Sequence, residues 1–249
     1  MKLERQRREW EQLAEVDPFW AALTEAGKRG GRWDRDEFLA TGETEVAEVM
    51  AAAAQFGLPA AHRRALDFGC GAGRLTRALA RHFDKAVGVD ISAGMIETAR
   101  ALNADVAGCE FRVNTSADLP QFDDGEFDFV YSSLVLQHLP GRELVRGYVA
   151  EFLRVVAPAG LVVFGLPARI RWPYRLGVSR RLYSALRRLG VDEETILRRT
   201  PLTPMRMTAV PERETLGLLE ARCARVLCAE LRDGGSVRTV RYYVAPGRG

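Results

Sequence analysis

The sequence is poor in cysteine, and the cysteines that it has follow no recognisable pattern. Four cysteines in 249 residues are too few and too irregularly spaced for a disulfide framework in a chain of this length. Cys223 and Cys228 stand five positions apart without a Cys or His pair nearby, so their spacing does not suit a zinc site. We therefore expect reduced, mostly buried thiols and no bound metal.

Long apolar runs are missing as well. No stretch approaches the ~20 consecutive apolar residues that a membrane-spanning helix requires. Residues 1–9 are densely charged and do not contain the apolar segment of a secretory signal. With 47% hydrophobic and 28% charged residues, the composition is that of an ordinary globular domain. The expected location is the cytoplasm, without a membrane span.

Lysine is nearly absent, because only three of the 36 basic residues are lysines and the remainder are arginines. The 33 acidic residues are interspersed among them and leave a net charge of +3. Nucleic-acid binding needs basic residues gathered on one face, so a nucleic-acid partner is not expected. One dense basic stretch runs from Arg169 to Arg199 and includes Trp172, Tyr174 and Tyr183. It is the only candidate for a charged binding surface.

The order of apolar patterns divides the chain into an N-terminal helical segment, residues 1–60, and a larger domain, residues 61–249. Within the domain, short apolar runs alternate with helical stretches, which is typical of a doubly wound, mostly parallel sheet with helices on both faces. The alternation stops over residues 168–205, which we interpret as a helical cap insertion over the site. It resumes with two strands around Gly234 and Gly235, a hairpin signal that makes the last strand antiparallel.

A glycine-rich turn joins the first strand of this domain to the following helix. Residues 65–75 read ALDFGCGAGRL, in which Gly69, Gly71 and Gly73 permit positive φ angles and close approach of a ligand to the backbone. Dinucleotide folds use the spacing G-x-G-x-x-G, but here Arg74 stands at the position of their third glycine. The turn by itself is weak support for a nucleotide site.

An acidic residue, Asp90, ends the next strand, 21 residues after Gly69. A carboxylate at this place can accept hydrogen bonds from both ribose hydroxyls of a nucleoside. Asp90 could alternatively cap the helix that begins after Ser92. Because the glycine turn lies at the matching distance, ribose binding is favoured over capping, and the two features together indicate a nucleoside site.

These residues open a series of motifs that resembles the class I S-adenosylmethionine-dependent methyltransferase family. The resemblance covers the first and second motifs, the adenine-side loop, the fourth strand and the turn before the fifth strand, at residues 66–73, 87–92 with Met95, 118–120, 127–132 and 156–160. The motifs occur in family order between residues 63 and 166. The resemblance implies a Rossmann-like α/β sheet of about seven strands. It also implies S-adenosylmethionine as the cofactor.

Carried onto this sequence, the resemblance implies how the cofactor is bound. The turn would face the methionine and ribose portions, Asp67 would support it, and Asp90 would bind the ribose hydroxyls. Many relatives have an acid at the position of Thr115, so the Ser116 amide or Asp118 would take over the contact with adenine here. The implied cofactor-binding residues are Asp67, Gly69, Cys70, Gly71, Gly73, Asp90, Ile91, Met95, Thr115, Ser116 and Ser132.

Methyl transfer from a sulfonium needs alignment of the nucleophile and exclusion of water more than a conspicuous set of catalytic groups. A hydroxyl acceptor would be helped by a general base, and histidine suits neutral pH. His138 follows the carboxyl end of the fourth strand, where the acceptor should lie. His138 and Tyr131 are therefore candidate catalytic residues, and Gln137 is a candidate substrate-binding residue. Two alternatives stay open, a structural His138 that holds its loop and a Tyr131 that only packs in the strand.

Three interpretations of the arginine-rich stretch also stay open. It could be a lid that recognises an acidic or phosphorylated acceptor, a surface for anionic lipid or nucleic acid, or a solvated helix face. Arg171 and Arg175, nearest the carboxyl end of the fifth strand, are the expected substrate contacts. In the N-terminal segment, Trp33 and Phe38 are expected either near the cofactor or as anchors of a helix to the core.

The sequence thus predicts an enzyme that methylates an oxygen or nitrogen of a small-molecule acceptor. Residues 132–135 read SSLV rather than [ND]-P-P-[YF], which argues against the subgroup that methylates amino groups of nucleic-acid bases. A protein or RNA methyltransferase and a catalytically silent cofactor-binding regulatory protein are the alternatives. A nicotinamide dehydrogenase fits least, because Arg74 replaces a dinucleotide glycine. The acceptor's identity and the oligomeric state are not predicted.

Overall fold

The computed structural model describes residues 2–25, 27–170, 177–233 and 237–247. Within these residues, seven strands form one sheet in the order β3-β2-β1-β4-β5-β7-β6. The first five run parallel, whereas β7 pairs antiparallel with β5 and β6. The predicted fold class is therefore confirmed. The strands are β1 Arg64–Phe68, β2 Lys85–Asp90, β3 Cys109–Val113, β4 Phe127–Ser132, β5 Val156–Ile170, β6 Arg225–Asp233 and β7 Val237–Ala245.

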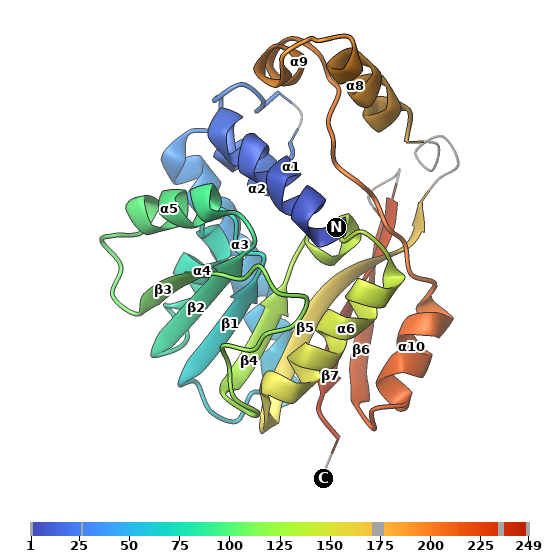
Figure 1. The fold of residues 1–249 in the computed structure, drawn as a ribbon. Coiled ribbons are helices and arrows are strands. Elements are labelled where there is room, and N and C mark those ends of the chain that lie inside the picture. The colour runs from blue at the N-terminus through green and yellow to red at the C-terminus, as the bar shows by residue number, and fades with distance from the viewer. Residues whose placement is uncertain (1, 26, 171–176, 234–236, 248–249) are drawn as a thin grey trace.

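Helices cover both faces of the sheet, and further helices lie beyond the carboxyl ends of the parallel strands (Figure 1). One face carries α3 Arg35–Ala54, α4 Arg74–Leu79 and α5 Ala93–Leu102, and the other carries α6 Arg142–Val155 and α10 Glu212–Glu220. The end of the sheet is covered by α1 Lys2–Val16, α2 Pro18–Ala22, the short 3₁₀ helix η1 Leu136–His138, α8 Val178–Arg188 and α9 Glu193–Arg199.

Helix α3 packs directly on the sheet, unlike the two helices before it. Val46, Val49 and Ala53 are buried in one apolar cluster with side chains of β1, β4 and α4. Gly42 allows α3 to approach α4, because a Cβ at this position would lie 2.4 Å from the Arg74 carbonyl oxygen. The N-terminal residues are thus divided between the core and the covering layer.

We call the covering layer the roof and define it as α1, α2, α8, α9 and the returning segment 201–210. Its helices share a small apolar cluster that includes Leu13 on α1, Tyr183 on α8 and Ile196 on α9. The cluster also contains Met95 of α5, so the roof rests on the core at that helix. The stretch between α9 and α10 returns to the core and passes η1, since Thr208 donates its backbone N–H to the Gln137 carbonyl at 2.6 Å.

The strand before the cap is longer than the sequence suggests. We expected the cap insertion to begin at residue 168, but β5 continues to Ile170 and pairs with β7 as far as Val237. The pairing explains the extension. After a register shift between Pro167 and Arg169, residues 169 and 170 pair with β7, and this pairing satisfies the hydrogen-bonding groups of their backbone. The described cap residues then form α8 and α9.

Candidate active site

The glycine turn after β1 is fixed by main-chain hydrogen bonds to the end of β2. The N–H groups of Gly69 and Cys70 both donate to the Val89 carbonyl, at 2.8 and 3.0 Å. Gly69, Gly71 and Gly73 have φ angles of 76°, 52° and 84°, which side chains rarely adopt. A Cβ at Gly69 would also lie 2.3 Å from a methyl carbon of Val135. The turn therefore requires glycine for both conformation and space.

Asp90 lies at the carboxyl end of β2 and holds the turn from the other side. Its Oδ2 accepts the Gly71 N–H at 2.9 Å, and its Oδ1 accepts the Ser92 N–H at 3.0 Å. Each carboxylate oxygen has a second lone pair, so two further donors can still be bound. Burial raises the pKa of Asp90. The N-cap of α5 is Ser92, whose Oγ accepts the Met95 N–H at 3.1 Å, and this assigns capping to Ser92.

A cavity of about 1130 Å³ opens over this end of the sheet. It exceeds the ~300–1,000 Å³ of common ligand pockets, so it has room for two reactants. We call the sheet side of the cavity the floor, lined by Phe68, Gly69, Gly71, Asp90, Ile91 and Met95. On the opposite side, roof residues that line the cavity include Gln6, Trp10, Ala22, Arg180, Met205 and Arg206.

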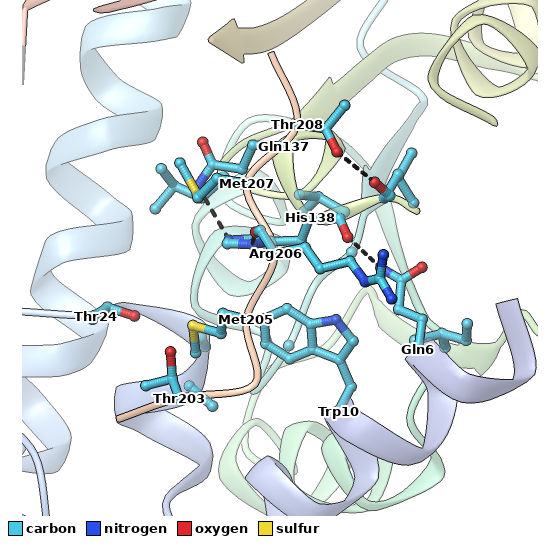
Figure 2. A pocket seen from close by; sticks show the side chains of 18 of the residues that line it. Gln6, Trp10, Thr24, Gln137, His138, Thr203, Met205, Arg206, Met207 and Thr208 are labelled. Carbon is cyan, nitrogen blue, oxygen red and sulfur yellow. Dashed lines mark hydrogen bonds between the residues drawn. The ribbon is translucent and has the colours of Figure 1, made fainter. Parts of the chain in front are cut away.

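His138, on η1, lies between floor and roof (Figure 2). Its Nδ1 is 2.6 Å from the Arg206 carbonyl oxygen, and its Nε2 is 3.2 Å from the Gln137 side-chain nitrogen. The Trp10 ring contacts it edge-on, with centroids 5.4 Å apart. The His138 carbonyl accepts a bond from the Gln6 side chain at 3.0 Å. These contacts connect α1, η1 and the returning segment at one point.

Burial lowers the pKa of His138 below its ordinary value. A neutral ring carries one proton, and the carbonyl of Arg206 can only accept, so the proton belongs on Nδ1. The lone pair is then on Nε2, where Gln137 donates its amide. The site thus contains a neutral imidazole with a defined tautomer and a basic nitrogen on the Gln137 side.

Comparison with known proteins places this arrangement in a family. Residues 66–164 match the family described as "Methyltransferase domain". The matched part of the chain, residues 66–164, thus belongs to the class I S-adenosylmethionine-dependent methyltransferase family. The ubiquinone biosynthesis O-methyltransferase of Methylococcus capsulatus is 35% identical over 122 residues, 47% of this chain and 49% of that protein. The tocopherol O-methyltransferase of Arabidopsis thaliana is 31% identical over 117 residues, 45% of this chain and 31% of that protein.

The fold is shared more widely than the sequence. The structure of magnesium protoporphyrin IX methyltransferase from Synechocystis PCC 6803, with bound SAM, superposes with a TM-score of 0.63 at 15% identity. The superposition covers 99% of this chain and 98% of that chain. The sequence matches are shorter, and the chain spans about half the length of the ubiquinone relative and less of the tocopherol relative.

The predicted cofactor-binding residues divide into two groups in the structure. Gly69, Gly71, Asp90, Ile91 and Met95 line the cavity. The others do not line it, and they comprise Asp67, Cys70, Gly73, Thr115, Ser116 and Ser132. Of the predicted substrate residues, Gln137 lines the cavity, whereas Arg171 and Arg175 lie outside the described residues.

The residues beneath the turn support it. Asp67 is buried and accepts the Thr76 hydroxyl at 2.7 Å, and burial raises its pKa to about 7. Cys70 is buried too, which raises the pKa of its thiol. Gly73 begins α4 and would collide with Phe111 if it carried a Cβ. Because these three residues do not line the cavity, they would influence a bound ligand only through the conformation of the turn.

The prediction that Tyr131 contributes to catalysis is not supported by its position. Successive side chains of a strand point to opposite faces, and Tyr131 points away from the cavity toward α3. Its hydroxyl donates to Glu45 at 2.7 Å, and Ser133 Oγ donates to the same carboxylate at 2.5 Å. Burial opposes ionisation of Glu45, but Arg74 at 2.8 Å and the two hydroxyls outweigh it and hold its pKa below the ordinary value. Tyr131 thus belongs to a buried polar network under the site.

The adenine-side residues differ from those expected. Thr115 is exposed, and the Ser116 carbonyl accepts the Tyr148 hydroxyl at 2.6 Å instead of facing the cavity. The cavity is lined there by Asn114 and Tyr148, which sequence reasoning missed. Asn114 directly follows β3, so the rule that ligands lie beyond strand ends could have identified it.

The N-terminal aromatic residues differ in their distance from the cavity. Trp33 and Phe38 are buried in a cluster behind the turn with Trp20 and Ala72, and neither lines the cavity. They anchor α3 and α2 to the core, which is the second of the two roles expected for them. Trp10 lines the cavity instead.

Two classes of feature were searched for within the described ranges. In those residues no group of three or more His, Cys, Asp or Glu side chains is arranged to hold a metal ion. No helix among them is sufficiently long and apolar to cross a membrane.

Proposed function

We propose that this chain transfers a methyl group from S-adenosylmethionine to an oxygen or nitrogen of a small-molecule acceptor, with S-adenosylhomocysteine as the second product. One observation carries the proposal: a single cavity joins Asp90 and the glycine turn to His138 and Gln137. The names of two relatives support a small acceptor, because they refer to ubiquinone biosynthesis and to tocopherol.

The floor fits the cofactor by its donor and acceptor pattern. Asp90 keeps one lone pair on each oxygen for the two ribose hydroxyls. Ile91 and Met95 supply apolar surface next to it for the adenine. Gly69 and Gly71 also line the cavity, and the absence of a Cβ at each lets Val135 and Ala22 pack against the turn without collision. When bound, S-adenosylmethionine supplies a methyl group on a sulfonium, whose departure leaves a neutral thioether.

The chain's own contribution is mainly alignment and exclusion of water. Holding two reactants in attack geometry can supply roughly 7–11 kcal/mol of the barrier reduction. The roof covers the cavity, and Ala22 of α2 lies against the turn, with its Cβ 2.9 Å from the Cβ position of Gly71. The acceptor would thus be confined between floor and roof with its nucleophilic atom toward the methyl group.

His138 is the group placed to accept the acceptor's proton. The Nδ1 proton is committed to the Arg206 carbonyl, so Nε2 carries the lone pair. Since burial lowers the pKa of His138, the ring stays neutral at pH 7 and is ready to act as a base. Gln137 donates to Nε2 in the structure, and an acceptor hydroxyl would take its place.

The experiment that tests the proposal uses methyl-labelled S-adenosylmethionine and a host extract, followed by separation of small-molecule, protein and RNA fractions. Label in a small-molecule fraction is the expected result, and mass spectrometry of that fraction identifies the acceptor. Label in protein or RNA would replace the proposal with the corresponding macromolecular methyltransferase. Tight cofactor binding with no label in any fraction would favour a regulatory protein without turnover.

The role of His138 is tested on the acceptor found in this way. His138→Ala should lower kcat about 100-fold, because a general base contributes roughly 10²–10⁴-fold. In the wild-type protein, kcat should be flat above pH 7 and fall only below the ordinary histidine pKa of ~6.5, since the pKa of His138 is lowered. His82→Ala, in the turn that follows α4 and outside the cavity lining, is the matched control. A lower melting temperature of the His138 variant with unchanged kcat would assign His138 a structural role only.

A further inference from the structure

Charge is distributed unevenly along the cavity. At the roof end, five arginines line it: Arg5, Arg180, Arg181, Arg188 and Arg206. Of the described residues that line the cavity, Asp90 is the one acid, and it belongs to the floor. The half of the cavity that would receive the acceptor is therefore strongly positive, whereas the floor is not.

The roof arginines are incompletely neutralised by the protein. Arg5 and Arg180 share the Glu9 carboxylate, at 3.0 and 3.6 Å. The Nε of Arg180 is buried and has no hydrogen-bond partner among the described residues. Within the same residues, Arg206 has no carboxylate within 4.0 Å. The positive charge at this end of the cavity is therefore only partly balanced, so an anionic ligand that accepts hydrogen bonds from the guanidinium groups would be favoured.

Burial and the neighbouring charges act on Arg206 in the same direction. Its pKa is lowered first by burial and then by the positive charges of Arg180 and Arg5, with only Glu9 opposing them. The Arg206 side chain extends from the returning segment toward Gln6 on α1 (Figure 2). Arg180 approaches from α8. Two separate elements thus bring guanidinium groups to one end of the cavity.

Apolar side chains line the same region and are unusually exposed. Leu134 is 41% exposed, Val178 50% and Met207 38%, and all three line the cavity. Leu134 also has a φ angle of 62°, a conformation that leucine rarely adopts. Apolar surface beside unsatisfied arginines suits a ligand that is apolar along one part and anionic at the other.

We propose that the methyl acceptor is an amphipathic anion, with its carboxylate or phosphate at the end of the cavity lined by Arg180 and Arg206. Its apolar body lies against Leu134, Val178 and Met207. The inference rests on the proposed function, because it names the chemical class of that reaction's acceptor. Arginine suits this role, since its planar fork matches the two oxygens of a carboxylate or phosphate.

The test uses two fluorescent probes that share one aromatic skeleton: the anionic 1-anilinonaphthalene-8-sulfonate and the neutral N-phenyl-1-naphthylamine. Both are titrated into the full chain saturated with S-adenosylhomocysteine, so that the floor is occupied. We expect the sulfonate to bind at least about tenfold more tightly than the neutral probe. Equal affinities for the two probes would overturn the inference.

Two arginine variants test whether the preference for the anionic probe comes from Arg180 and Arg206. Arg180→Met and Arg206→Met keep apolar side-chain volume and should each weaken sulfonate binding about tenfold, while neutral-probe binding stays within about twofold. Arg199→Met, exposed on α9 and outside the cavity, is the matched control and should change neither affinity. An equal loss in the Arg199 variant would show a general surface charge effect and would contradict the proposal. Melting temperatures show whether each variant is folded.

Calorimetry with S-adenosylhomocysteine separates this inference from the proposed function. The Arg180 and Arg206 variants should bind it with wild-type affinity. If either variant loses that affinity, the arginines hold the carboxylate of the cofactor and the inference about the acceptor is wrong. If the wild-type protein itself does not bind S-adenosylhomocysteine, the proposed function fails, and the inference fails with it.

Discussion

The floor and the roof of the cavity are stabilised by different kinds of interaction. In the floor, main-chain hydrogen bonds join Gly69 and Cys70 to Val89, and Asp90 holds Gly71. In the roof, helices rest on a small apolar cluster, and their charged side chains are largely exposed. The family match covers residues 66–164, which include the floor and stop short of all four roof helices.

This difference separates two chemical tasks. Under the proposed function, the floor would bind a donor that the relatives' reactions have in common, and the roof would contact an acceptor that differs from one relative to another. A floor built from glycine conformations and main-chain bonds tolerates little change. A roof of amphipathic helices can exchange its lining side chains while keeping its apolar contacts. The identity of the methyl donor can therefore be inferred from the relatives, whereas the class of acceptor has to be inferred from the residues of this chain's roof.

The largest expected effect tests the floor directly. Asp90→Ala removes the acceptor of the Gly71 N–H and the carboxylate that we propose accepts from both ribose hydroxyls. Two hydrogen bonds to a charged group contribute about 1.5–3 kcal/mol each, so we expect about a 10³-fold loss of affinity for S-adenosylhomocysteine. Isothermal titration calorimetry measures it.

The control for this change is Asp118→Asn, an exposed acid of the loop after β3 that does not line the cavity. It should leave the affinity within about threefold of the wild-type value, as expected for an exposed polar substitution. If Asp118→Asn lost as much affinity as Asp90→Ala, the loop after β3 would be assigned a direct contact with the adenine. Unchanged affinity in Asp90→Ala would contradict the assignment of cofactor binding to the floor.

The second effect tests whether α3 belongs with the floor. Glu45 on α3 accepts from Tyr131 of β4 and from Ser133, which directly follows β4, and it pairs with the buried Arg74. Glu45→Gln leaves Arg74 without a counter-charge, and breaking a buried pair typically costs about 3–5 kcal/mol. We expect the free energy of unfolding to fall by about 3 kcal/mol, measured by urea denaturation.

Glu43→Gln on the same helix is the matched control for Glu45. Glu43 pairs with Arg81 at 2.6 Å, and both side chains are substantially exposed. Exposed ion pairs contribute about 0–1 kcal/mol, so this variant should be close to wild type. If the two variants were equally stable, α3 would be grouped with the roof rather than with the core.

The sequence contained most of the floor and little of the roof, for a physical reason. Gly69, Gly71 and Asp90 signal their roles locally, because a turn needs positive φ and a strand end presents a carboxylate. Gln6 and Arg206 line one cavity although they are 200 positions apart, and no local pattern reveals that. Tyr131 was misassigned because a strand end predicts proximity to the site but not which face a side chain takes.

The smallest expected effect concerns Asp67, which lies beneath the glycine turn of the floor. Burial raises its pKa to about 7, while the unfolded carboxyl titrates near 3.8. Between these values the native protein holds a proton that the unfolded chain has lost. The free energy of unfolding therefore falls as the pH rises toward and through 7, because the buried carboxylate is disfavoured.

Asp67→Asn removes this titration and keeps an oxygen that accepts from Thr76. Since one pKa unit corresponds to about 1.4 kcal/mol and Asn makes only a neutral hydrogen bond, we expect a gain of about 2 kcal/mol at pH 8 and almost none at pH 5. Urea denaturation at the two pH values measures it. Asp105→Asn should have the opposite sign, because the bond from Arg77 lowers the pKa of Asp105 to about 2. A gain for Asp67→Asn that did not depend on pH would mean that Arg74 keeps Asp67 ionised throughout.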